Sequence, residues 1–303
     1  MNSIESLKLD FNSQVKDLGN IHNQKIFDDC VYVGSGDSFV AGLIAEYLTN
    51  KCRCYSPSDL VNSTLSDGKT YCFISVTGKT KANIELARRA KKSGLRTAAV
   101  TANVKSKLAQ VCDQVIPLNI TRVKTPTAGF RTFVANVITC LQLLGMNLPN
   151  KFDHWHKNAT GISSKISESL ILPDNVLYML GNNLLYPIAL YASFQMAEFF
   201  GTIAVAHKLE EFCHSPIFGL KKSNNVWILG QNEKIYSSRF KELGPRISYI
   251  ELFNSDLVTQ VFQSIFLVQN LMLQLATRYG YTELQYRVEE DILKVSSDLI
   301  YDV

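Results

Sequence analysis

One local pattern constrains the fold of this chain more than any other feature. A short apolar run is followed by a turn of small residues and then by a helical stretch, first at 31–49 and again at 71–93. Further apolar runs at 97–100 and 114–118 continue the series. Short apolar runs that alternate with helices are typical of parallel strands joined by right-handed crossovers. We therefore predict a doubly wound parallel sheet in this part of the chain.

The same plan returns after a segment rich in polar residues at 150–172. Apolar runs at 176–181 and 226–230 each precede a helical stretch, and 246–252 has the composition of another strand. A length of 303 residues suits two domains of ordinary size or one large domain, and the repeated plan favours two. We predict an α/β protein of two tandem domains, each a doubly wound parallel sheet flanked by helices. The first spans 1–150 with an N-terminal helix, and the second spans 151–303 with a C-terminal tail.

Composition narrows the classes of function. The formal net charge is only +4, and about thirty residues precede the first strand, so neither a nucleic-acid binder nor an N-terminal helix-turn-helix module is favoured. The apolar stretches at 128–146 and 257–276 are interrupted by polar residues, which indicates buried helices rather than membrane spans. The N-terminus has early carboxylates and no signal-peptide pattern. Seven cysteines without a CxxC motif favour the cytoplasm over a disulfide-rich secreted protein.

Metal binding has little support in the sequence. His154 and His156 form the one close histidine pair, and no carboxylate or cysteine motif completes a ligand set. We expect a solvated pair in the polar segment between the halves, with no metal and no cofactor.

Hydroxyl side chains gather in the two turns that follow the strands of the first half. Ser35 and Ser38 lie in the first turn, and Ser75, Thr77 and Thr80 in the second. Glycines, hydroxyls and a helix N-terminus together form an anion site, most naturally for phosphate. The alternative is ordinary helix capping by serine or threonine.

The two common nucleotide motifs do not fit these turns. A dinucleotide fingerprint needs a third glycine where Phe39 stands, and a Walker loop needs its first glycine where Phe73 stands. A small monophosphate is therefore the simpler ligand.

The chain resembles the sugar isomerase (SIS) domain family, whose members bind phosphosugars. The resemblance rests on the spacing of the two turns and on the segments 181–198 and 209–217, which are similar to the isomerase half of glucosamine-6-phosphate synthases. It covers about residues 28–290 and implies two tandem SIS domains, each with a five-stranded parallel sheet. It also implies a homodimer with shared active sites and a small sugar phosphate as the ligand.

Roles follow from the resemblance position by position. Glu198 matches the carboxylate that moves a proton between C1 and C2, and His214 matches the imidazole that opens the sugar ring from the partner subunit. Glu211 is a second choice for the base, because it lies three residues before His214, as in a related arrangement of archaeal phosphosugar isomerases. The family's hydroxyl ligands for the sugar phosphate match Ser35, Ser38, Ser75, Thr77 and Thr80, its tail lysine matches Lys294, and its contacts to sugar hydroxyls match Thr125 and Thr127.

The chain also departs from the family pattern. Gln195 stands where the synthases have a lysine, Ala128 replaces another lysine, and the alignment of Lys294 is loose. No cysteine follows Met1, so the synthase's use of glutamine is not expected. The resulting hypothesis is an aldose–ketose isomerase of sugar 6-phosphates. A glucosamine-6-phosphate deaminase and a phosphosugar sensor without turnover are the alternatives.

Overall fold

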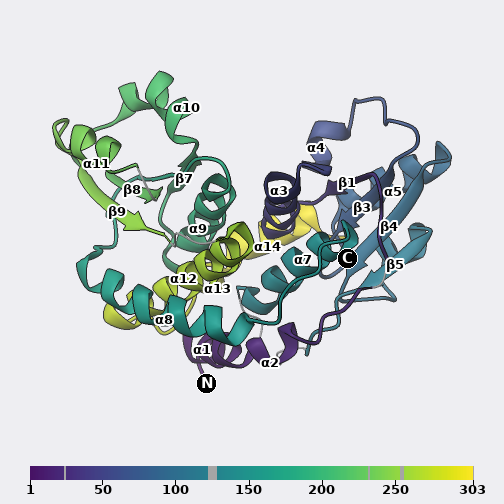
Figure 1. The fold of residues 1–303 in the computed structure, drawn as a ribbon, viewed down its shortest axis with the longest axis horizontal. Coiled ribbons are helices and arrows are strands. Elements are labelled where there is room, and N and C mark those ends of the chain that lie inside the picture. Colours follow the sequence, from purple (N-terminus) through teal and green to yellow (C-terminus); the bar gives the residue numbers. More distant parts are fainter. Residues whose placement is uncertain (24, 122–127, 231–232, 253–255, 303) are drawn as a thin grey trace. The chain divides into compact units, whose positions relative to one another are not determined.

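The computed structural model describes residues 1–23, 25–121, 128–230, 233–252 and 256–302 (Figure 1). The chain divides into two compact units. The five-stranded unit consists of Lys16–Lys124, Gly129–Asn150 and Glu289–Val303. The four-stranded unit consists mainly of Met1–Val15 and Lys151–Val288.

The sheet of the five-stranded unit is entirely parallel and has the order β2-β1-β3-β4-β5. Its strands are β1 (Cys30–Val33), β2 (Cys52–Tyr55), β3 (Thr70–Ile74), β4 (Arg96–Thr101) and β5 (Gln114–Pro117). Its helices are α2 (Val15–Leu18), α3 (Asp37–Thr49), α4 (Pro57–Leu60), α5 (Lys81–Lys92), α6 (Lys107–Val111), α7 (Phe130–Leu143) and α14 (Glu290–Ile300). The order reverses between β1 and β3, and in doubly wound sheets ligands bind beyond the carboxyl ends of the strands at this point.

Helices cover both faces of this sheet (Figure 1). On one face Val31, Phe73 and Ala99 pack with residues of α4, α5 and α6 in a buried apolar cluster. On the other face α3 and α7 pack together, and the Tyr32 hydroxyl donates to the Cys140 carbonyl of α7 at 2.6 Å. The strands are buried on both sides, which explains their nearly continuous apolar sequences.

The four-stranded unit has a parallel sheet of order β7-β6-β8-β9. Its strands are β6 (Leu177–Leu180), β7 (Ala204–His207), β8 (Asn225–Gly230) and β9 (Arg246–Glu251). Its helices are α1 (Ser3–Ser13), α8 (Phe152–Ser169), α9 (Leu185–Phe200), α10 (Leu209–His214), the 3-10 helix η1 (Pro216–Gly219), α11 (Lys234–Lys241), α12 (Leu257–Arg278) and α13 (Gln285–Val288). Leu180, Phe212 and Phe240 belong to the apolar cluster that joins the sheet to α10 and α11. The other layer contains α9, α12 and α8.

The prediction of an α/β fold with parallel sheets flanked by helices is confirmed. The prediction of five strands in the second half is wrong, because the described residues form four. The chain passes from β9 to the 22-residue helix α12 within a few residues and continues into α13 and α14, so no room remains for another strand–helix repeat.

The polar segment at 150–172 is not a solvated linker. It forms α8, whose buried face includes Phe152, Trp155 and His156. His156 is buried and shares a hydrogen bond with the Phe11 carbonyl at 3.1 Å, whereas His154 is exposed. The two histidines therefore do not form a solvated pair. The many small polar residues of α8 make its single apolar face hard to recognise in the sequence.

The ends of the chain pack differently from the predicted halves. Helix α1 belongs to the four-stranded unit, and α14 belongs to the five-stranded unit. The tandem arrangement of SIS domains and the boundary at 150/151 stay predictions.

Candidate functional site

The turn after β3 brings two predicted ligands together. Ser75 is 4% exposed, and its Oγ lies 3.0 Å from Oγ1 of Thr80. The Ser75 hydroxyl also accepts a hydrogen bond from the Gly78 N–H at 3.2 Å. Thr77 is exposed, and its hydroxyl accepts from the Lys79 N–H at 3.3 Å. We call residues 75–80 the hydroxyl turn.

Gly78 holds the hydroxyl turn close to the rest of the sheet. Its φ is +63°, and a Cβ placed there would lie 2.0 Å from Oγ and 2.4 Å from Cβ of Ser106. The Gly78 carbonyl accepts from the Leu108 N–H at 3.2 Å. A side chain at position 78 would therefore push the turn away from the start of α6.

The hydroxyl turn leads directly into the N-terminus of α5. Thr80 is the N-cap residue, and its side chain makes no capping hydrogen bond. Its hydroxyl is directed to Ser75 instead, so simple helix capping does not account for this threonine. The first N–H groups of a 12-residue helix and its positive dipole end therefore adjoin the hydroxyls.

The turn after β1 adjoins the same edge, because β1 pairs directly with β3. Gly34 is packed so tightly that a Cβ would lie 2.8 Å from the backbone carbon of Ser38. Ser35 is exposed and Ser38 is half-buried, and the Ser38 N–H donates to the Ser35 carbonyl at 3.2 Å. The two turns thus lie at the reversal of strand order, as predicted for a ligand site.

Asp37 is a residue of this turn that the sequence analysis missed. It is the first residue of α3, and burial raises the pKa of its carboxyl to about 7. The signal in the sequence is the place of this aspartate directly after Gly-Ser-Gly, at the start of a predicted helix.

In the four-stranded unit, Glu198 lies in the last turn of α9 and is half-buried. The Gln195 amide Nε2 donates to Oε2 of Glu198 at 3.3 Å. Gln195 is fully buried, and its Oε1 is without a hydrogen-bond partner among the described residues. Gln195 is therefore a hydrogen-bond donor to the predicted base.

Tyr286 of α13 is a second neighbour of Glu198 that the sequence analysis missed. Burial and, to a smaller extent, the negative charge of Glu198 together raise the pKa of its phenol to about 12. In the sequence this tyrosine belongs to no recognisable motif.

Contacts from two distant parts of the chain fix α13 beside α9. The Leu284 N–H donates to the Ser3 hydroxyl of α1 at 2.8 Å. On the other side, a Cβ at Gly201 would lie 2.9 Å from Cγ of Gln285, so the end of α9 passes directly beneath α13. Tyr286 therefore has a well-supported position.

The structure does not bring His214 and Glu211 to Glu198 through any contact among the described residues. Both lie on α10 and are exposed. Nε2 of His214 lies 3.9 Å from Oε1 of Glu210 on the same helix. Helix α10 begins where the Leu209 N–H donates to Oδ1 of Asn182 at 3.1 Å.

Two further predictions fall outside this arrangement. Lys294 lies on α14, none of whose residues is buried. Thr125 and Thr127 lie outside the described residues.

The described part of the chain contains no group of three or more histidine, cysteine, aspartate or glutamate side chains suited to a metal ion. None of its described helices combines the length and the apolar character needed to cross a membrane.

Sequence comparison finds relatives that act on a sugar phosphate. The chain is 24% identical over 245 residues to the glutamine–fructose-6-phosphate aminotransferase (isomerizing) of Sulfurisphaera tokodaii, a match covering 76% of this chain and 41% of that protein. It is 25% identical over 211 residues to the enzyme of the same name from Thermotoga maritima, covering 61% of this chain and 34% of that protein. The chain thus matches less than half the length of these curated relatives. No family profile matches it.

Structural comparison shows a shared fold. Glucosamine-6-phosphate deaminase from Thermotoga maritima superposes with a TM-score of 0.75 at 17% identity, over 94% of this chain and 96% of that chain. The C-terminal domain of the glucosamine-fructose-6-phosphate aminotransferase from Francisella tularensis gives 0.70 at 17% identity, over 91% and 96%. Tagatose-6-phosphate ketose/aldose isomerase from Escherichia coli gives 0.62 at 14% identity, over 92% and 89%. The chain has the fold of these phosphosugar enzymes, and fold alone does not assign a reaction.

Proposed function

We propose that this chain is a phosphosugar isomerase that interconverts aldose and ketose 6-phosphates, or their amino-sugar counterparts. The observation that carries the proposal is the buried Ser75 hydroxyl, 3.0 Å from that of Thr80, at the N-terminus of α5. Hydroxyl donors beside unpaired helix N–H groups suit a phosphoryl group. The names of the relatives and structural neighbours support the same class of ligand.

In this proposal the two turns bind the phosphoryl group. Ser75, Thr77 and Thr80 are its hydroxyl ligands, and Ser35 and Ser38 contribute from the neighbouring turn. The tight packing around Gly78 orders the donors before the ligand arrives, which lowers the entropy cost of binding.

Glu198 is the proposed base. Its carboxylate removes a proton from one of the carbons C1 and C2 while the carbonyl oxygen gains a proton, which gives a cis-enediol. The proton is then returned to the other carbon while the hydroxyl on the first carbon loses its proton and becomes the new carbonyl. A base in this role works best with a fixed direction and a pKa near the working pH. The Gln195 amide provides the direction through its bond to Oε2.

The remaining roles complete the proposal. An exposed His214 can reach the sugar ring of a partner subunit in a homodimer and open the ring, with Glu211 as the second candidate base. Thr125, Thr127 and Lys294 are assigned to the sugar hydroxyls and the open-chain carbonyl. A cytoplasmic location suits a reaction on phosphorylated metabolites.

The test is a panel of hexose, amino-hexose and pentose phosphates in D₂O, followed by NMR. We expect an isomeric product with deuterium at C1 or C2. Glu198→Gln should lower kcat by about 10²–10⁴-fold while phosphosugar affinity stays within about twofold. Glu211→Gln is the matched control and should retain activity; loss of turnover in that variant alone would make Glu211 the base.

A deaminase is the second candidate, because the structure of a glucosamine-6-phosphate deaminase matches 96% of its own length to this chain. Release of ammonia from glucosamine 6-phosphate in a coupled assay would replace the isomerase assignment. Tight binding of phosphosugars with no turnover of any panel member would replace both with a sensor.

A further inference from the structure

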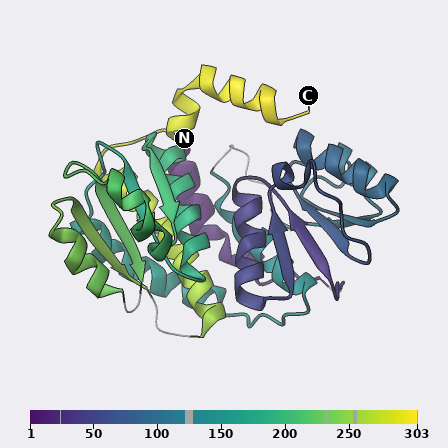
Figure 2. The ribbon, with the colours of Figure 1, turned by 90° about the horizontal axis from the view of Figure 1, so that it is seen from above.

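The helix α14 is the yellow helix of Figure 2, and the described residues that follow it contact the hydroxyl turn, within the five-stranded unit. The Asp302 N–H donates to the Lys79 carbonyl at 2.8 Å, and Tyr301 forms an antiparallel bridge with Thr80. The Lys81 ammonium donates to the Asp298 carbonyl at 2.6 Å. Three consecutive residues at the start of α5 are thus in contact with the segment 298–302.

The same segment carries a negative charge to this place. Oδ2 of Asp302 lies 2.9 Å from Nζ of Lys107, the first residue of α6. The hydrogen bond from Lys107 lowers the pKa of the Asp302 carboxyl, and the charges of Arg88 and Lys81 lower it further. Cations that would attract a phosphoryl group therefore already face a carboxylate of the chain itself.

We infer that the segment 298–302 is an internal ligand of the hydroxyl turn and competes with the phosphoryl group of a sugar phosphate. Its backbone pairs with residues 79 and 80. The Asp302 carboxylate forms an ion pair with Lys107, and the Asp298 carbonyl accepts a hydrogen bond from Lys81. A phosphoryl group at the N-terminus of α5 would occupy the same side of the hydroxyl turn and would be attracted by the same positively charged side chains. This inference rests on the phosphate site of the proposed function.

The segment is held in a way that allows it to leave. No residue of α14 is buried, and Ile292, Val295 and Leu299 are 66%, 60% and 72% exposed. The ion pair of Asp302 with Lys107 is itself partly exposed, with 32% and 49% of the two side chains accessible. Segments with few buried apolar contacts open at low cost, and exposed ion pairs hold weakly. The apparent affinity for phosphate then equals the intrinsic affinity multiplied by the fraction of molecules whose segment is released.

The test compares the binding of inorganic phosphate and fructose 6-phosphate by calorimetry in the full chain and in two variants. Asp302→Asn weakens the docking of the segment, and removal of residues 299–303 abolishes it. We expect both changes to raise the affinity by about three- to tenfold, with the larger effect in the truncated chain. Glu290→Gln is the matched control: it removes a charge from the same helix, away from the turn, and should leave the affinity unchanged.

A second readout follows the segment directly. Saturating phosphate should accelerate hydrogen exchange at the Asp302 N–H in the wild-type chain, because this group loses its bond to Lys79.

The outcomes separate the two proposals. Unchanged affinity in both variants and unchanged exchange would overturn the internal ligand, while a loss of phosphate binding in Ser75→Ala would leave the proposed function standing. If Ser75→Ala binds phosphate as well as the wild type does, the phosphate site itself is wrong, and the competition fails with it.

Discussion

At the scale of single residues, Gly78 is the position where the hydroxyl turn is most sensitive to change. A methyl group there meets Ser106 at 2.0 Å and must also adopt a φ of +63°. We expect Gly78→Ala to lower the free energy of unfolding by about 2–4 kcal/mol, from overpacking and backbone strain together. Phosphate affinity should fall in the same variant, because Ser75 and Thr80 lose their spacing.

Gly94→Ala is the control for this prediction. Gly94 also has a positive φ, +77°, but a Cβ there meets nothing within 4 Å. Chemical denaturation should show about 1 kcal/mol of strain in this variant and no change in phosphate affinity. Equal losses in the two variants would show that strain, rather than contact with Ser106, explains Gly78.

Substitution of Gln195 tests whether its amide orients Glu198, the proposed base. Its Nε2 stabilises the charged form of Glu198, so Gln195→Leu should raise the pKa of the base. The acidic limb of the kcat profile should then move to higher pH by about one unit. Stability should change little, because leucine also removes an amide oxygen that has no described partner.

Gln142→Leu provides the comparison. Oε1 of Gln142 likewise has no described partner, and its Nε2 donates to the Ile21 carbonyl at 2.7 Å, in the five-stranded unit. This variant should leave the pH profile in place. A shift in both profiles, or in neither, would remove the positioning role from Gln195.

Asp37 gives a prediction about pH and stability. Its pKa is raised to about 7 in the folded chain, against about 3.9 when unfolded, so the folded state retains a proton that the unfolded state has lost between these values. Stability should therefore fall as the pH rises from about 4 to 7. Asp37→Asn should flatten this part of the curve in denaturation experiments, and an unchanged slope would show that the carboxyl does not titrate there.

Residue types in local sequence predicted much of the candidate site. Ser75 and Thr80 were found because hydroxyls that follow an apolar run at the start of a helix form a recognisable pattern. Tyr286 was not found, since its place beside α9 depends on Ser3 and Gly201, which lie far away in the sequence. A local sequence pattern does not indicate contacts between residues that lie far apart in the chain.

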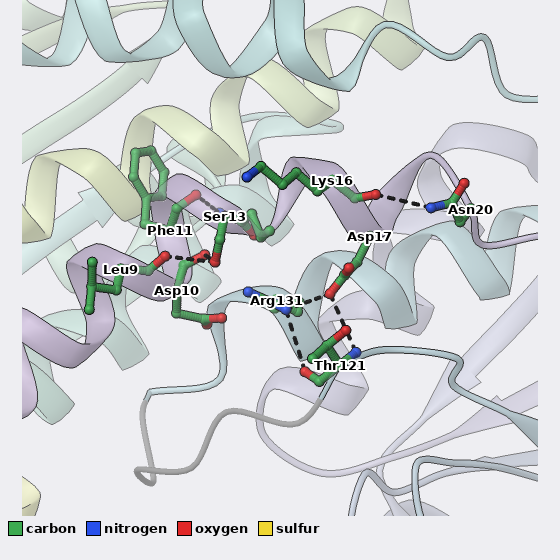
Figure 3. A network of polar contacts seen from close by, with 10 residues as sticks. Leu9, Asp10, Phe11, Ser13, Lys16, Asp17, Asn20, Thr121 and Arg131 are labelled. Carbon is green, nitrogen blue, oxygen red and sulfur yellow. Dashed lines mark hydrogen bonds and ion pairs between the residues drawn. The ribbon is translucent and has the colours of Figure 1, made fainter.

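At the scale of elements, a small polar network joins α2, α7 and the residues after β5 (Figure 3). The Arg131 guanidinium forms an ion pair with Asp17, whose carboxylate also accepts from the Thr121 N–H at 3.4 Å. The Arg131 side chain is 8% exposed and that of Asp17 is 23% exposed. Because Asp17 would be left partly buried without its partner, Arg131→Met should cost about 2–3 kcal/mol in thermal or chemical unfolding.

Lys157→Met is the matched change on the surface. Lys157 pairs with Asp153 at 2.7 Å, and both side chains are largely exposed. Its loss should cost less than about 1 kcal/mol. Similar values for the two variants would mean that burial contributes nothing to the network of Arg131.

Elements with apolar runs in the sequence were predicted well, including the edge strands β5 and β9, whereas the edge strands β2 and β7 were not predicted. The strands β3 and β8 begin within a residue of the apolar runs that start at 71 and 226, and α5 ends within a residue of position 93. The edge strands β2 and β7 have four residues each and include Arg53 and His207. Strands with one exposed side need no continuous apolar run, so only their pairing partners identify them.

At the scale of the whole molecule, the N-terminal helix α1 and the C-terminal helix α14 each belong to the unit that is formed mainly by the other half of the sequence. Phe11 of α1 is 1% exposed, and its ring lies 4.2 Å from that of His156 in α8. Sequence order predicts that residues near the N-terminus stabilise the first half, whereas the packing of α1 against α12 assigns them to the four-stranded unit. Amphipathic periodicity shows that a helix has an apolar face and leaves its partner undetermined.

Phe11→Ala distinguishes these two assignments. Truncation of a buried phenylalanine costs about 3–5 kcal/mol, and hydrogen exchange can locate where this loss is felt. We expect protection to fall in α8, α9 and α12 while β1, β3 and β4 keep theirs. Leu9→Ala, on the same helix but 58% exposed, should leave both sets of amides unchanged. If protection falls in β1, β3 and β4 instead, α1 stabilises the first half, as sequence order suggests. The assignment of α1 to the four-stranded unit would then be wrong.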